Sequence, residues 1–140
     1  MEPANTEIER ADTKTAFRSE VLYIITALLP PLGFPFLGWY YLRHRNDNNP
    51  LAQAHLMQTI IAGGLISFLL VLTNGLIIYL DGYNSVTALI IFEIYFLLFI
   101  PVFVFPGIVG VVKASSGEIF RFPLIARLAG IKHLNHDQNE

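Results

Sequence analysis

Charged side chains are excluded from three long stretches of this 140-residue chain, and this exclusion limits the folds that it can adopt. Apart from Glu93, every Asp, Glu, Lys and Arg lies outside the stretches, which cover residues 21–42, 48–80 and 82–112. A transmembrane helix needs about 20 apolar residues, whereas a helix of a soluble protein keeps a polar face. The sequence therefore predicts an all-α integral membrane protein with three hydrophobic spans.

The overall composition excludes several other classes of protein. The chain is 54% hydrophobic and 14% charged, has a formal net charge of -2 and contains no cysteine. A disulfide scaffold and a thiolate metal site need cysteine, a disordered chain is far less apolar, and a nucleic-acid binder presents a basic surface. We expect the lipid bilayer as the main partner, together with a membrane-protein partner or a second copy of the chain, and no nucleic acid.

The pattern divides the chain into three parts. Residues 1–20 form a polar amino-terminal arm, residues 21–112 form the transmembrane domain, and residues 113–140 form a cytoplasmic tail. The spans are expected at about 21–42, 56–80 and 86–112. In the tail, a short amphipathic helix is expected over about 123–134. It lies either at the lipid interface or against a cytoplasmic loop of the protein itself.

Prolines interrupt the first hydrophobic stretch. Pro30, Pro31 and Pro35 lack backbone donors, so no regular helix is expected through its middle. If the stretch crosses in a kinked form, the chain has three spans and its amino terminus lies outside. If it re-enters, all nine Lys and Arg lie on one face, but each arm is only half a bilayer long and its broken backbone needs protein cover. We favour three crossings; in both cases the tail is cytoplasmic and Asp81 lies outside, in a bacterial inner membrane.

Glu93 is the one formal charge inside a predicted span and marks a candidate intramembrane polar site. Asn74 and Glu93 lie at similar distances on either side of the turn at residues 81–85, so their side chains are expected at similar depth. Thr73 is a further candidate partner. Two interpretations stay open: a proton- or cation-linked site, and a carboxyl group that its neighbours satisfy.

A second candidate site consists of polar side chains at the expected cytoplasmic face. Cations at this face bind lipid phosphates or an anionic partner segment, or they simply mark the membrane interface. The candidate residues are Arg43, Arg45, His55, Gln58, Arg121 and Arg127.

Short motifs between residues 50 and 124 resemble those of a known family. They are Pro50-x4-His55-x2-Gln58, Lys113-Ala114 and Gly117-Glu118-x-Phe120-Arg121-Phe122-Pro123-Leu124. The pattern is similar to bacterial relatives of the twenty-kilodalton chloroplast inner-envelope translocon component, over roughly residues 20–128, although phenylalanines stand where that family commonly has tyrosine. The resemblance implies a proline-containing first span and a role in moving or inserting protein across a membrane.

These features indicate a structural, assembly or translocon-like subunit of a membrane complex. The alternative is a transporter or channel subunit that uses Glu93. An enzyme is not expected, because no pair of acid and base residues or phosphate-binding loop is recognisable. No cofactor is expected either, and no metal, since only His133 and His136 are close in sequence.

Overall fold

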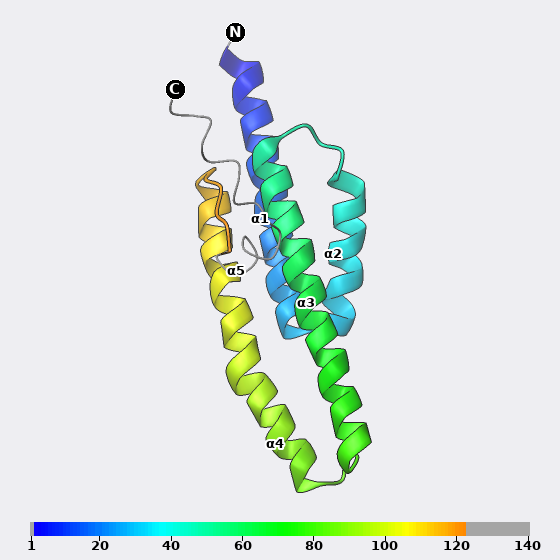
Figure 1. The fold of residues 1–140 in the computed structure, drawn as a ribbon. Coiled ribbons are helices and arrows are strands. Elements are labelled where there is room, and N and C mark those ends of the chain that lie inside the picture. Colours follow the sequence, from blue (N-terminus) through cyan, green and yellow to red (C-terminus); the bar gives the residue numbers. More distant parts are fainter. Residues whose placement is uncertain (1, 123–140) are drawn as a thin grey trace, which may run out of the picture.

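The computed structural model describes residues 2–122, and every regular element in this range is helical. The first three helices are α1 (Glu2–Leu28), α2 (Pro30–His44) and α3 (Pro50–Leu80). The chain then forms α4 (Val86–Ile94), a π-helical segment η1 (Tyr95–Phe99) and α5 (Ile100–Ser115), which follow one another as one long rod (Figure 1). The predicted all-α class is confirmed for the described residues.

The prolines at 30 and 31 reverse the chain instead of kinking a single span. Helix α1 ends at Leu28, and α2 restarts at Pro30, a position where the missing N–H of proline costs no helical hydrogen bond. Helix α2 then runs back alongside α1 (Figure 1). The expectation of three crossings, with residues 21–42 as one span, is therefore wrong. Among the described residues, two segments are long and apolar enough to cross a membrane, Pro50–Leu80 and Val86–Ser115.

Side-chain caps and a glycine turn define the α3–α4 hairpin. The Asn49 side chain accepts hydrogen bonds from Leu51 N and Ala52 N at 2.7 and 3.3 Å, which satisfies donors at the start of α3. Ser85 accepts from Ala88 N at 3.1 Å and caps α4 in the same way. Gly82 has a φ of 72°, a conformation that favours glycine. The turn expected at residues 81–85 is thus present.

The polar segment expected as a separate arm belongs to α1, so no element ends at residue 20. Ser19 and Glu20 are fully buried, because this part of α1 packs against α3 and α5. The amphipathic helix expected over 123–134 lies outside the described residues.

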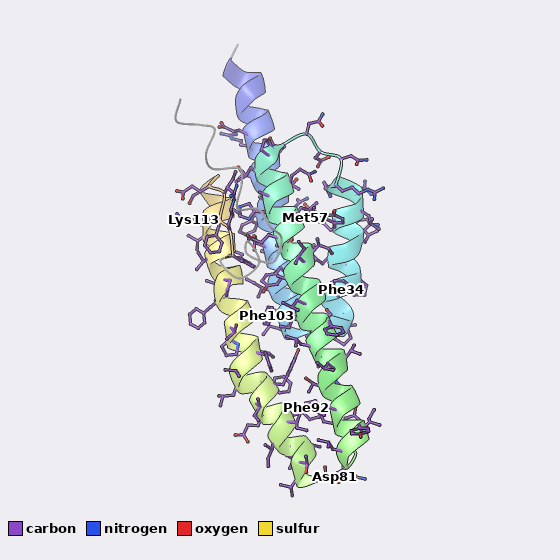
Figure 2. The ribbon with its side chains drawn as sticks, in the orientation of Figure 1. Phe34, Met57, Asp81, Phe92, Phe103 and Lys113 are labelled. Atoms are coloured by element: carbon purple, nitrogen blue, oxygen red, sulfur yellow. The ribbon has the colours of Figure 1, made fainter. Side chains whose placement is uncertain are left out.

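The molecule has two halves with different numbers of helices (Figure 1). In the four-helix half, α1, α2, α5 and residues 50–66 of α3 lie side by side around a core. The core residues are Tyr23, Ala27, Leu37, Ala62, Ile66, Phe103 and Phe122. In the two-helix half, residues 68–80 of α3 lie beside α4 and η1. Figure 2 shows Phe92 and Asp81 in this second half and Lys113 at the opposite end of the molecule.

Candidate functional site

A buried group of polar side chains lies where α1, α3 and the segment after α5 meet. Glu20 and His55 are fully buried, and His55 Nδ1 lies 2.6 Å from Glu20 Oε1. The other ring nitrogen, His55 Nε2, lies 3.0 Å from the carbonyl oxygen of Glu118. Gln58 Oε1 accepts a hydrogen bond of 2.7 Å from Phe122 N. We call Glu20, His55 and Gln58 the polar core cluster.

Helical spacing on α1 and α3, together with a glycine on α5, brings the side chains of the polar core cluster together. His55 and Gln58 are three residues apart on α3 and therefore project from the same face. On α1, buried Ala16, Glu20 and Tyr23 follow the same helical spacing. Gly110 on α5 leaves the space that the Glu20 carboxylate fills, because a Cβ atom at this position would collide with that carboxylate. The cluster thus depends on three helices.

The hydrogen-bond geometry fixes how many protons the Glu20–His55 pair holds. Both ring nitrogens of His55 face oxygen atoms, so Nε2 must carry a hydrogen, and a second proton must lie between Nδ1 and Glu20 Oε1. Burial raises the pKa of the Glu20 carboxyl, while the hydrogen bond and the charge of His55 act to lower it. An unpaired buried charge is strongly unfavourable. The burial of each side chain therefore depends on the presence of the other.

Two atoms of the cluster keep unused hydrogen-bonding capacity. Glu20 Oε2 and Gln58 Nε2 are buried and have no hydrogen-bond partner within the described part of the chain. Gln58 nevertheless lies close enough to Glu20 to favour its charged form. Across residues 2–122 no group of three or more His, Asp and Glu side chains is arranged to hold a metal ion.

The polar core cluster fastens the segment after α5 onto the helices. Gly117, with a φ of 70°, turns the chain back at the end of α5, and Lys113 forms an ion pair with Glu118. Phe122 is buried, and its ring centroid lies 5.5 Å from that of Tyr23. The bonds from His55 and Gln58 to this segment therefore hold it against α1 and α3. The arrangement can retain a proton and fix a chain segment.

The residues expected at the cytoplasmic face fall into two groups. Arg43, Arg45 and Arg121 are exposed, and the Arg43 guanidinium lies 5.6 Å from the centre of the Trp39 ring. His55 and Gln58 instead face the protein interior and are not exposed to lipid headgroups. Arg127 lies outside the described residues.

Sequence reasoning missed Glu20, which it assigned to the amino-terminal arm. The available signal was the spacing of Ala16, Glu20, Tyr23 and Ala27, which places these residues on one side of a single helix running through the expected boundary.

Within the described residues, Glu93 and Asn74 form no hydrogen bond with each other. Glu93 is exposed on α4. The Asn74 side chain donates to Leu70 O at 2.7 Å and accepts from the Tyr83 hydroxyl at 2.7 Å, while Thr73 donates to Leu69 O at 2.8 Å. The polar groups of Asn74 and Thr73 are thus used locally, and a functional role for Glu93 stays a prediction.

Comparison with known families assigns the chain to one of them. A family model described as the magnetosome magnetite crystal formation protein family (MamF/MmsF) matches residues 12–129, which include the whole polar core cluster. The chain belongs to this family. No curated protein and no solved structure matches it.

The family assignment corrects the resemblance to the chloroplast translocon component, so the translocon role implied by that resemblance loses its basis. The motifs behind the resemblance are short, and the structure gives them general structural tasks. Pro50 begins a helix, His55 and Gln58 make buried hydrogen bonds, and Gly117 forms a turn. Such requirements do not identify one family.

Proposed function

We propose that the chain is a small integral membrane protein of the magnetosome membrane and supports magnetite crystal formation in a structural or assembly role. The observation that carries this proposal is the family match over residues 12–129. The two apolar segments Pro50–Leu80 and Val86–Ser115 support the membrane location. We further propose that a membrane-protein partner or a second copy of the chain completes the assembly.

The surface of the molecule supports insertion into a bilayer. Large apolar side chains of α3 and α4 are exposed along the two-helix half, including Val71, Ile78 and Leu89. Exposed aromatic residues lie near the two ends of the apolar surface, with Trp39 beside Arg43 at one end and Tyr83 at the other. Trp and Tyr are enriched at both membrane interfaces.

The charge distribution supports one orientation. Among the described residues, the Lys and Arg side chains belong to the four-helix half, and the turn at residues 81–85 has none. They are Arg10, Lys14, Arg18, Arg43, Arg45, Lys113 and Arg121. Positively charged segments stay on the cytoplasmic side. We therefore place the end with these cations in the cytoplasm and the Asp81 turn on the other side, in a membrane derived from the bacterial inner membrane.

The proposed role is not enzymatic. Glu20 and His55 are a potential acid and base, but both side chains are fully buried, and Gly110 packs against the Glu20 carboxylate. General acid–base catalysis needs a group within hydrogen-bonding reach of the substrate. The closed position of this pair supports a structural role.

Deletion of the encoding gene in a magnetite-forming bacterium that carries it tests the proposed function. We expect crystals of altered size, shape or number in electron micrographs, and recovery when the wild-type gene is returned. Membrane fractionation should find the protein with the magnetosomes. Unchanged crystals after deletion, or a protein absent from the magnetosome membrane, would contradict the proposal.

The variant Glu93→Gln separates the proposed role from transport. Because Glu93 is exposed and makes no hydrogen bond within the described residues, we expect this variant to restore the crystals as well as the wild type does. A variant that reaches the membrane at the normal level but fails to restore the crystals would instead favour a transport or channel function that uses this carboxylate.

A further inference from the structure

The α1–α2 hairpin accompanies only part of the length of α3. A Cβ atom at Gly63 of α3 would meet Leu37 at 2.7 Å and Thr26 at 3.4 Å, which places the middle of the hairpin beside this residue. The hairpin turn at Leu29 lies a few residues further along. From there α3 continues to Leu80, over roughly 15–20 Å at the helical rise of about 1.5 Å per residue. This distance corresponds to about half of the 30 Å hydrocarbon core of a bilayer.

The backbone of the hairpin turn is suited to an environment without water. At the start of a helix the first N–H groups lack partners, and an unpaired N–H is unfavourable in lipid. Pro30 and Pro31 have no N–H, while Leu32 N and Gly33 N both donate to Leu29 O, at 3.1 and 2.8 Å. Leu29 N donates to Ile25 O at 2.8 Å. The two prolines thus remove the donors that would otherwise be unpaired at this point.

The outer face of the hairpin is apolar. Its exposed large apolar side chains include Leu28, Leu29, Leu32, Phe36, Trp39 and Leu42. Leu32, Phe36 and Trp39 follow helical spacing and form one stripe on α2, which ends where Arg43 covers the Trp39 ring. Trp and Arg in this arrangement are typical of the boundary between acyl chains and headgroups. Acyl chains of a single leaflet are therefore the occupant that fits this face.

We propose that the α1–α2 hairpin is a wedge that enters only the cytoplasmic leaflet, so that the protein favours membrane that is convex toward the cytoplasm. This inference rests on the membrane function proposed above. Four helices, α1, α2, α3 and α5, occupy one leaflet, whereas α3 and the rod formed by α4 and η1 cross the other (Figure 1). Each helix has a diameter of about 10 Å, so the protein expands the first leaflet more than the second. In a vesicle inside a cell, the cytoplasmic leaflet is the convex one.

Spin labels on single cysteines test the depth of the hairpin, because the chain contains no cysteine of its own. The full chain would be reconstituted in phosphatidylcholine–phosphatidylglycerol liposomes as Leu29→Cys, Leu76→Cys and Asn84→Cys variants. We expect the Leu29 and Leu76 labels to be accessible to oxygen and protected from a water-soluble nickel reagent, and the Asn84 label to be accessible to nickel. A nickel-accessible Leu29 label beside a protected Leu76 label would overturn the wedge alone. Nickel access to both would overturn the membrane function as well.

The distribution of labelled protein among vesicles of different diameter tests the effect on curvature. With the hairpin in the outer leaflet, we expect the protein density per membrane area to be enriched at least about two-fold in small vesicles over large ones. Molecules inserted in the reverse orientation serve as the internal control and should show the opposite trend. The Leu32→Ser/Phe36→Ser double variant should lose part of the enrichment. Equal densities in both orientations would overturn the proposal even if this variant fails to fold.

Discussion

Side chains in the four-helix half pack against several helices, whereas large apolar side chains in the two-helix half are mostly exposed along α3 and α4. Tyr23 and Leu37 are almost completely buried in the first half, while Val71 and Tyr79 are 69% and 84% exposed in the second. The first half also holds the buried Glu20–His55 pair, whose members lie 35 residues apart in sequence. Internal packing therefore specifies the four-helix half, whereas much of the apolar surface of the two-helix half is left exposed.

Close contacts between helices also distinguish the four-helix half from the two-helix half. Gly33, Gly107 and Gly110 leave no room for a Cβ atom, while nothing lies near Gly75 in the two-helix half. Substitutions at closely packed positions of the four-helix half should therefore change stability much more than similar substitutions at open positions of either half. The following predictions test this contrast, in order of decreasing effect.

The largest effect is expected for His55→Ala. This change removes the partner of the buried Glu20 carboxyl and the contact to Glu118 O, so the free energy of unfolding should fall by about 3–5 kcal/mol. Unfolding by denaturant in detergent micelles measures the loss. Met57→Ala, on the exposed side of the same helix, is the matched control and should cost much less. Equal losses in the two variants would mean that the pair does not stabilise the four-helix half.

A pair of glycines on α2 gives the second comparison. In Gly33→Ala the new Cβ would lie 2.6 Å from Thr26 N, which forces α1 and α2 apart and should cost about 1–3 kcal/mol. In Gly38→Ala nothing lies within 4 Å of the new methyl group, so the higher helix propensity of alanine should stabilise the protein by up to about 1 kcal/mol. Thermal unfolding of the two variants provides the test. A neutral Gly33→Ala would show that the hairpin is not closely packed.

The smallest expected difference concerns two tyrosine hydroxyls. Tyr23 is buried and donates to Phe103 O at 2.8 Å, so Tyr23→Phe should lower the free energy of unfolding by about 1 kcal/mol. Tyr83 donates to Asn74 at 2.7 Å in an exposed position, so Tyr83→Phe should cost less. Denaturation of both variants under identical conditions gives the two losses. A larger loss for Tyr83→Phe would contradict the contrast between the halves.

Local patterns made part of the fold predictable. The long apolar runs predicted the rods that became α3 and the α4–α5 continuation, and the polar turn at residues 81–85 predicted the hairpin between them. The prolines at 30 and 31 were recognised as a break, but a break is compatible with both a kinked span and a reversal. Contacts such as that of Gly33 with Thr26 show that the chain reverses its direction at this break.

The candidate site was predictable only in part. His55 and Gln58 drew attention as polar residues at the start of an apolar helix, and the sequence placed them at a lipid interface. Their partner Glu20 lies in a segment whose charged residues indicated a separate arm. Its burial became visible only once α1, α3 and α5 were packed together.

The sequence by itself determined the helical class, the two long apolar segments and the turn at Asp81, because hydrophobic runs, caps and turn residues act on their neighbours along the chain. Only the tertiary structure decided the direction of the chain after Leu29, the Glu20–His55 pair and the division into two unequal halves. These features depend on residues far apart in sequence, and their contacts form only when several helices pack at the same time.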